Sequence, residues 1–238
     1  MKKVLFIVGL HGDEKTPVEV IKKFRPKVKF LVANKPALKK GKRFLEADLN
    51  RVFPGKKKGT LEEILAGKIL SRIKEIKPNV VVDFHCSTGF TPAFVILTRK
   101  SKKHLLLAKR MGIGKVVFMG RKIASGKSLI DNVSLGVSVE TGKEGLKRTE
   151  EAITKVIKNI IGGRESFINE RFEVFDVLKK VDPKETLVKD IRPFVEVKKG
   201  ELISNLKGKK RYAPVDFYPV LPRTKSYSGT LCLMAKKC

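Results

Sequence analysis

The sequence predicts an α/β fold: a mixed, mostly parallel sheet with helices on both faces, plus a small β-rich C-terminal domain. Over the first two-thirds of the 238 residues, short apolar runs typical of buried strands alternate with segments of helical periodicity. After Gly162 and Gly163 the pattern changes to short strand-like runs separated by turns. We therefore expect one domain over residues 1–164 and a second over residues 165–238.

The strands of the first domain are predicted from apolar runs. The first run is continuously apolar, as in strands buried on both faces, and the run that ends at His85 is interpreted as another buried strand. The strands are expected over Val4–Gly9, Val28–Ala33, Val80–His85, Ala93–Thr98, Lys115–Met119 and Leu135–Glu140. Ligands of such sheets bind beyond the carboxyl ends of the strands, which makes the residues at those ends the first candidates for a site.

Helices are predicted between these strands from apolar periodicity and from start signals. Thr16 is the expected N-cap of the first, with Pro17 at the first helical position. Thr60 and Glu63 form the capping box of the clearest one. The helices are expected over residues 17–24, 61–76, 104–111 and 146–161.

The second domain is predicted to be built from short strands. They are expected over Phe172–Val177, Glu185–Val188, Pro193–Val197, Glu201–Ile203, Tyr218–Leu221 and Thr230–Met234.

The chain is strongly basic, with 53 Lys and Arg against 24 Asp and Glu, a formal charge of +29. This excess is compatible with nucleic-acid binding, with steering of anionic substrates, or with a solvated basic surface. The basic residues are not interleaved with aromatic residues and no RNA-binding signature is present. We therefore favour the solvated surface and do not expect a nucleic-acid partner.

No apolar stretch reaches the length of a membrane span. The N-terminal apolar run is short and leads directly into His11, so it is interpreted as a strand and not as a signal peptide. The 3 cysteines form no C-x-x-C pair and no disulfide framework. We expect a cytoplasmic protein without a membrane partner, and the sequence leaves open whether it is a homo-oligomer.

Candidate metal ligands stand where buried strands end. His11 and Glu14 follow the first strand, and His85 and Glu140 end two others. Two imidazoles and a carboxylate suit a hydrolytic zinc site with one open coordination position, and a further carboxylate suits a general base. The alternative is that these residues bind no metal. His11 would then be a loop histidine, Glu14 a glutamate favoured at a helix N-terminus, and His85 a core histidine whose hydrogen bonds are satisfied within the protein.

The irregular stretch over residues 34–59 contains the segment Arg43–Arg51. A structureless stretch of this length inside a compact domain is usually functional. Asn50 and Arg51 can bind a carboxylate through an amide donor and a guanidinium fork. The alternative is a charged surface loop.

Four motifs in order resemble the succinylglutamate desuccinylase/aspartoacylase family. They are G-x-H-G-x-E at Gly9–Glu14, Arg43 with D-L-N-R up to Arg51, D-x-H-x-x-T at Asp83–Thr88, and E-x-G at Glu140–Gly142. The resemblance implies a zinc amidohydrolase. Its zinc carboxypeptidase-like catalytic domain would be residues 1–164, and its β-rich domain, residues 165–238, would contribute to the substrate site.

The resemblance also implies roles for single residues. One zinc ion per chain would be held by His11, Glu14 and His85. Glu140 would take a proton from the attacking water and pass it to the leaving amine.

Further roles concern the substrate. Arg43 would stabilise the oxyanion, while Asn50 and Arg51 would bind a substrate carboxylate. Tyr227 would close over the substrate, and Asp83 would support a metal ligand.

The sequence departs from the family where aspartoacylases have an arginine for another substrate carboxylate. Arg121 or Lys127 stands in that region, without a clear alignment. We expect hydrolysis of an N-acyl amide of a small anionic, carboxylate-bearing substrate such as an N-acyl amino acid. The alternatives are a carboxypeptidase-like peptidase and, less favoured, a basic nucleic-acid-binding protein.

Overall fold

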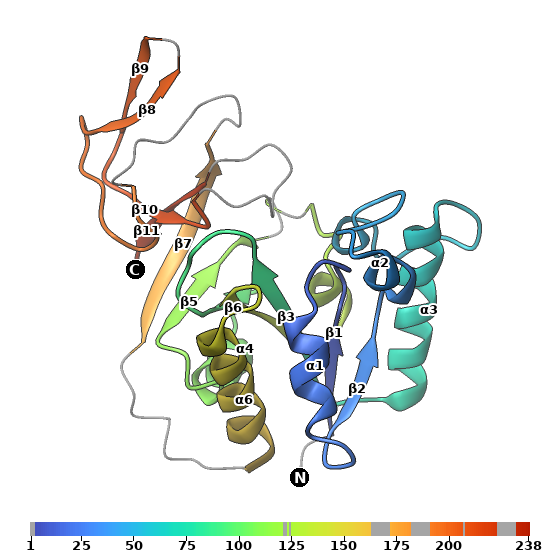
Figure 1. Ribbon diagram of the computed structural model, residues 1–238. Helices are drawn as coiled ribbons and strands as arrows, with labels where there is room; N and C mark the ends of the chain where they lie inside the picture. The colour runs from blue at the N-terminus through green and yellow to red at the C-terminus, as the bar shows by residue number, and fades with distance from the viewer. Residues whose placement is uncertain are drawn as a thin grey trace.

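The computed structural model describes residues 3–120, 123, 125–162, 172–181, 191–206, 208–222 and 232–238. The strands are β1 (Val4–Val8), β2 (Lys29–Val32), β3 (Val80–Ser87), β4 (Phe94–Leu97), β5 (Lys115–Phe118), β6 (Gly136–Lys143), β7 (Glu173–Lys180), β8 (Leu202–Leu206), β9 (Lys209–Tyr212), β10 (Tyr218–Val220) and β11 (Leu233–Lys237). Nine of them form one sheet in the order β10-β11-β7-β5-β4-β6-β3-β1-β2, and β8 pairs separately with β9 (Figure 1).

The main sheet is mixed and mostly parallel. β1 pairs in parallel with β2 and β3, β3 with β6, and β5 with both β4 and β7. The antiparallel pairs are β4 with β6 and the two at the edge formed by β7, β11 and β10. This arrangement confirms the predicted fold class.

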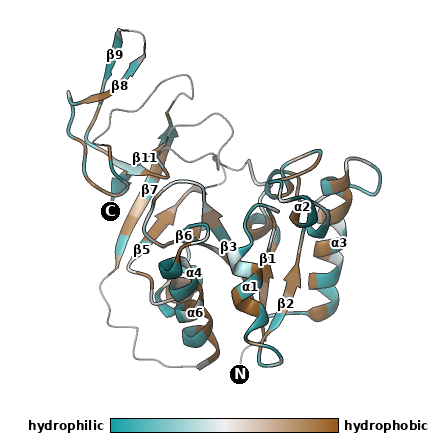
Figure 2. Cartoon of the chain, viewed as in Figure 1, coloured by the Kyte–Doolittle hydropathy of each residue, from teal (hydrophilic) through white to brown (hydrophobic). Residues whose placement is uncertain are grey.

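Helices cover both faces of the sheet. They are α1 (Thr16–Lys22), α2 (Lys35–Lys40), α3 (Leu61–Ile76), α4 (Lys102–Arg110), α6 (Lys147–Gly162) and the 3₁₀ turns η1 (Leu49–Arg51) and η2 (Leu129–Asn132). One core cluster joins the strands to α1, α4 and α6, and another joins them to α3, η1 and η2. Figure 2 shows β1 and β5 as predominantly hydrophobic ribbons between these layers, as expected for strands buried on both faces.

The helix α2 was not predicted. It is short, its only fully buried residue is Ala37, and it carries no long apolar stripe. Asn34 accepts the N–H of Ala37 at its start, and Gly41 ends it in the left-handed conformation. These local capping signals, not periodicity, mark the helix.

The prediction that Thr16 caps α1 is wrong. Lys15 is the N-cap residue, and Thr16 is already helical. The carboxylate of Glu144, just after β6, accepts the N–H groups of Lys15 and Thr16 and the Thr16 hydroxyl at 3.1, 2.9 and 2.8 Å. An acceptor from a distant segment therefore replaces the local cap.

Strands beyond residue 165 extend the main sheet through β7, β10 and β11. The expected strand over residues 193–197 is not formed. In this segment the structure has an isolated bridge between Val197 and Phe217 and no continuous ladder. The expected strand over residues 185–188 lies outside the described residues. The division into domains at residue 164 stays a prediction.

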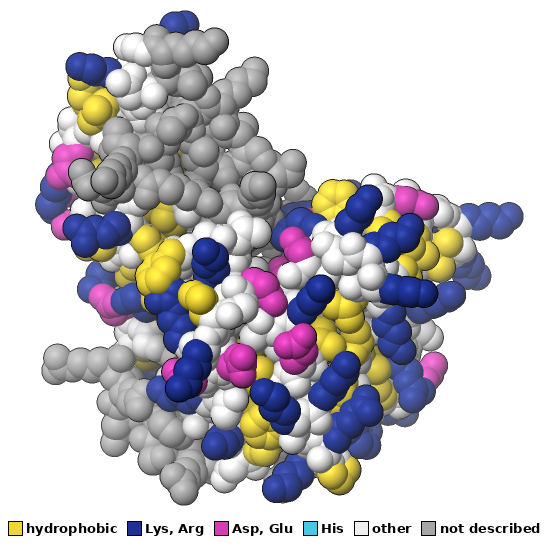
Figure 3. Space-filling model, viewed as in Figure 1, with side chains coloured by type: hydrophobic (Ala, Val, Ile, Leu, Met, Phe, Trp, Pro, Cys, Tyr) yellow, Lys and Arg dark blue, Asp and Glu magenta, His cyan; other side chains and the backbone are white. Residues whose placement is uncertain are grey.

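The surface carries the large positive charge in a dispersed form. Figure 3 shows Lys and Arg side chains spread over the visible face. Within the described part of the chain, no helix is long and apolar enough to cross a membrane.

Candidate metal centre

Three neighbouring strands bring the predicted ligands together. In the sheet, β3 lies between β1 and β6 and runs parallel to both. His11 follows β1, and His85 in β3 pairs with Glu140 in β6. The carboxyl ends of parallel strands meet at the same edge of the sheet, so these side chains converge.

A glycine allows the turn after β1 to pack closely. A Cβ atom at Gly12 would lie 2.1 Å from the carbonyl carbon of Ala37 in α2. The Gly12 N–H donates to the carbonyl of Arg43 at 3.1 Å. The turn that carries His11 and Glu14 is therefore held against α2 and the loop that follows it, an approach that a side chain at position 12 would prevent.

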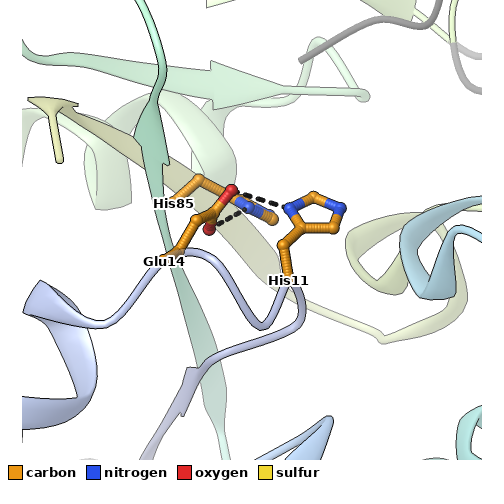
Figure 4. A group of neighbouring side chains, drawn as sticks. All are labelled: His11, Glu14 and His85. Carbon is orange, nitrogen blue, oxygen red and sulfur yellow. Dashed lines mark hydrogen bonds and ion pairs between the residues drawn. The ribbon is translucent and has the colours of Figure 1, made fainter. Parts of the chain in front are cut away.

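Glu14 lies between the two imidazole rings (Figure 4). Its Oε1 is 2.7 Å from His11 Nδ1, and its Oε2 is 3.0 Å from His85 Nδ1. All three side chains are buried, and their ligand atoms lie within 4.8 Å of one another. The structure thus gathers the three residues into one group that can hold a metal ion.

The other nitrogen of each imidazole is held by an aspartate. His11 Nε2 donates to Asp48 Oδ1 at 3.0 Å, and His85 Nε2 donates to Asp83 Oδ2 at 2.8 Å. Ser138 donates to the same oxygen of Asp83 at 3.0 Å. An aspartate that accepts from Nε2 leaves Nδ1 as the ligand atom, which is the usual support of a metal-binding histidine.

The electrostatics of this group favour positive charge. Burial lowers the pKa of His85, but Asp83 and Glu14 outweigh it and raise the pKa well above its usual value. Burial also lowers the pKa of His11, but Glu14 and Asp48 outweigh it and raise this pKa above its usual value. Burial raises the pKa of Glu14, but the two imidazoles reverse this and hold it below its usual range. A metal cation would be stabilised by the same carboxylates.

Glu140 has the properties of a proton acceptor. It is buried, and no residue in the described ranges forms a hydrogen bond with its Oε2. Burial, reinforced by the charge of Glu14, raises its pKa to about 7, although His85 acts in the opposite direction. A carboxyl group with a pKa near neutrality can both accept and return a proton at physiological pH.

Asp48 links a ligand to Arg43. While Asp48 Oδ1 accepts from His11, its Oδ2 accepts from Arg43 Nε and Nη2 at 3.3 and 3.1 Å. Arg43 Nη1 lies 3.9 Å from Glu14 Oε1, so the guanidinium group reaches the candidate metal-binding group. Sequence reasoning missed this role, although Asp48 is the first residue of the D-L-N-R motif.

Asn50 and Arg51 lie on η1 at the same cavity. Asn50 Oδ1 accepts the Leu129 N–H at 2.9 Å, and Arg51 Nη1 donates to the Asn50 carbonyl at 2.8 Å. Among described residues, the cavity is lined by His11, Glu14, Arg43, Asn50, Arg51, His85, Ile96, Thr98, Met119, Ser128, Ile130, Ser138 and Glu140. The structure therefore brings together all of the predicted site residues that it describes.

Tyr227 lies outside the described residues, as does Arg121. Lys127, the other candidate for a second carboxylate-binding cation, is described but is not among the residues that line the cavity.

The loop with Arg43 and Asp48 is anchored by Glu62, a buried residue at the start of α3. The Glu62 carboxylate accepts three successive backbone N–H groups of this loop at 2.8, 3.2 and 3.1 Å. It also accepts from Asn34 Nδ2 at 3.2 Å. Sequence analysis did not single out Glu62, because a glutamate in a first helical turn is ordinary.

A family comparison covers the part of the chain that contains this site. The model of the succinylglutamate desuccinylase/aspartoacylase catalytic domain matches residues 1–161. This chain belongs to that family. Succinylglutamate desuccinylase from Pseudomonas putida is 38% identical over 64 residues, and the match covers 22% of this chain and 19% of that protein. Curated relatives are matched over 19% to 41% of their own length, so this chain spans less than half of each.

Solved structures share the fold over the whole chain. Murine aminoacylase 3 superposes with a TM-score of 0.81 at 18% identity, covering 100% of this chain and 95% of that one. Succinylglutamate desuccinylase from Vibrio parahaemolyticus superposes with a TM-score of 0.75 at 18% identity, covering 100% and 82%. At this identity the likeness shows a common fold.

Proposed function

We propose that this chain is a zinc-dependent amidohydrolase that cleaves the N-acyl amide of a small carboxylate-bearing substrate. One observation carries the proposal: the Nδ1 atoms of two buried histidines face the carboxylate of Glu14, and an aspartate holds each Nε2. Names of similar proteins, such as succinylglutamate desuccinylase and aminoacylase 3, support N-acyl amides as the substrates.

The donor set fits zinc. His11, Glu14 and His85 would hold the ion, because two imidazole nitrogens and a carboxylate leave a coordination position open for chemistry. When bound, zinc would lower the pKa of water and polarise the scissile carbonyl.

The remaining residues would perform the proton transfer and bind the substrate. Glu140 would take a proton from the attacking water and deliver it to the departing nitrogen. Arg43, held by Asp48, would stabilise the negative charge that develops on the carbonyl oxygen. Asn50 and Arg51 would hold the substrate carboxylate.

Metal binding tests the proposed centre directly. The metal-free protein should take up one zinc ion per chain, measured by elemental analysis after gel filtration, and His85→Ala should lose it. His104→Ala is the matched control, since His104 is a buried histidine on α4 that bonds to Ser101. Equal zinc uptake by His85→Ala and the wild type would refute the centre.

Hydrolysis tests the reaction. The zinc-loaded wild type should release amines from N-acyl amino acids faster than it releases amino acids from short peptides. Glu140→Gln should lose activity by at least about 100-fold while retaining zinc. Preference for peptides would favour the carboxypeptidase-like alternative, and full activity of Glu140→Gln would remove Glu140 from the mechanism.

A further inference from the structure

A large cavity lies at the edge of the main sheet opposite the candidate metal centre. Its volume is about 740 Å³, which is within the range of about 300–1,000 Å³ that small-molecule sites occupy. It is lined by residues at or just before the amino ends of β1, β2, β3 and β6, which run parallel. Figure 1 shows this edge at the bottom, where the N-terminus is marked. The residues of the candidate metal centre stand at or near the carboxyl ends of the strands, so the two cavities are separate.

The floor of this cavity belongs to the protein core. Phe6, Val80 and Leu107 have exposed fractions of 1%, 2% and 6%, and they pack in the core cluster that joins the sheet to α1, α4 and α6. Ile160 and Ile161, near the end of α6, continue this apolar surface and are partly buried. Packing therefore holds the floor in place, and an aliphatic group that lay on it would be removed from water.

The cavity is reached from solvent beside α4. Leu106 lines it and is 43% exposed, while the next residue, Leu107, is buried in the floor. An exposed leucine beside an apolar hollow enlarges the apolar surface that a ligand can cover.

Cationic side chains surround the apolar floor. They come from the start of the chain, from β2 and the segment before it, and from α4, and they are Lys3, Lys27, Lys29, Lys103 and Arg110. The four lysines are exposed and the arginine is partly buried. Lysine lays its aliphatic stem along apolar surface and keeps its ammonium group in water. The cavity thus combines an apolar floor with a positively charged rim, and a ligand with an apolar body and one anionic end complements both.

Charge and shape also bear on other occupants of the cavity. A second copy of this chain would bring the cationic rim against another protein with a formal charge of +29, which is electrostatically unfavourable. Insertion into a bilayer uses an apolar face that enters the lipid, whereas here the buried floor lies inside a hollow. A single amphipathic anion suits the cavity better than either.

We propose that this cavity binds aliphatic carboxylates, the anions of medium- and long-chain fatty acids. The aliphatic chain would pack on Phe6, Val80 and Leu107, and the carboxylate would stay at the rim among the lysines and Arg110. The site lies at the opposite edge of the sheet from the candidate metal centre, so this inference does not depend on the proposed amidohydrolase function.

Calorimetry with a series of ligands tests the chemistry of the site. Octanoate, decanoate and dodecanoate would be titrated into the zinc-loaded protein below their micelle concentrations. Burial of each CH₂ group should raise the affinity by about 4-fold, so each step of two carbons should raise it by about 15-fold. Decyltrimethylammonium, which has a positive head, should bind at least about 10-fold more weakly than decanoate. An affinity that is independent of chain length, or equal binding of the cationic amphiphile, would overturn the inference.

Substitution of the exposed leucine tests the position of the aliphatic chain. Leu106→Asp should weaken dodecanoate binding by at least about 10-fold, because it places a charge on the apolar surface. Leu178→Asp is the matched control, since Leu178 is a leucine on β7 that is 52% exposed and does not line the cavity. Equal affinities of the two variants would refute the proposed position of the chain.

Substitution of the rim tests the position of the carboxylate. The double variant Lys29→Glu, Lys103→Glu should weaken dodecanoate binding by at least about 10-fold. Lys68→Glu, Lys74→Glu is the matched control, because it makes the same change in net charge at exposed positions of α3. If both double variants bound dodecanoate equally well, the rim would have no role and the inference would fail.

A variant of the candidate metal centre separates the two sites. Because a carboxylate could also bind zinc, dodecanoate is titrated into His85→Ala, and its affinity should equal that of the wild type. Loss of binding in His85→Ala would place the carboxylate at the metal centre and overturn the inference. Binding to phosphatidylglycerol vesicles without binding of monomeric dodecanoate would overturn it in favour of a membrane surface. A dimer that Leu106→Asp dissociates, seen by sedimentation in a protein that binds no dodecanoate, would overturn it in favour of self-association.

Discussion

Replacement of Glu62 by glutamine would release the loop that carries Arg43 and Asp48. The two Glu62 oxygens each accept two hydrogen bonds, from Asn34 Nδ2 and a backbone N–H at Oε1 and from two backbone N–H groups at Oε2. Glutamine keeps one acceptor oxygen and replaces the other with an NH₂ group. In either orientation of the amide, that NH₂ group would face two N–H donors.

The magnitude follows from these contacts. A hydrogen bond to a charged group contributes about 1.5–3 kcal/mol, so the loss of two such bonds at a fully buried position should cost about 4 kcal/mol. A domain is commonly stable by only about 5–15 kcal/mol, so the loss should be easily measured. Displacement of Arg43 by about 1 Å should also lower kcat/KM by about 100-fold.

Urea unfolding followed by circular dichroism would measure the change in unfolding free energy. Glu63→Gln is the matched control, because Glu63 occupies the next position of α3 and its carboxylate contacts Thr60 and Lys56 but accepts none of the N–H groups bound by Glu62. Glu63→Gln should lose less unfolding free energy than Glu62→Gln, and its kcat/KM should equal that of the wild type. If Glu62→Gln lost no more stability than Glu63→Gln, the anchoring role assigned to Glu62 would be refuted.

Two substitutions at the centre have separate consequences. Asp48→Asn should weaken zinc binding by about 10–100-fold in a chelator competition, because it disturbs the hydrogen bond to His11. It should also lower kcat/KM, because Asp48 holds Arg43. An unchanged zinc affinity would contradict this role of Asp48. Burial raises the pKa of Glu140 from its usual 4.5 to about 7 in the metal-free fold, so its contribution to stability is fully present below pH 4.5 and is lost as the pH rises from about 4.5 to 7. Glu140→Gln should therefore stabilise the metal-free protein at pH 8 by up to about 3 kcal/mol and have little effect below pH about 4, as thermal unfolding at both pH values would show.

Several elements could be predicted because their signals are local. The capping box of Thr60 and Glu63 starts α3 as expected, and apolar runs located β1, β3 and β6. The helix α2 was missed because six residues do not establish a period, and the cap of α1 was misassigned because Glu144 is remote in sequence.

The sequence by itself determined which residues are the candidates for the chemistry. Apolar runs placed His11, His85 and Glu140 at strand ends, since central strands buried on both faces are largely apolar. It also indicated the family, through motifs whose order and spacing survive in the linear chain. Nothing in that linear order showed how the ligands would be supported or what surrounds them.

Tertiary structure alone decided the supporting contacts. Three of these contacts join segments that are distant in sequence. Asp48 bridges His11 and Arg43, Glu62 anchors the loop that carries Arg43 and Asp48, and Ile130 lines the same cavity. Hydrogen bonds and packing act over a few ångströms in space, whereas sequence patterns report only local periodicity and caps. For this reason the sequence predicted the candidate site residues, and the folded chain defined their geometry and the cavity beside them.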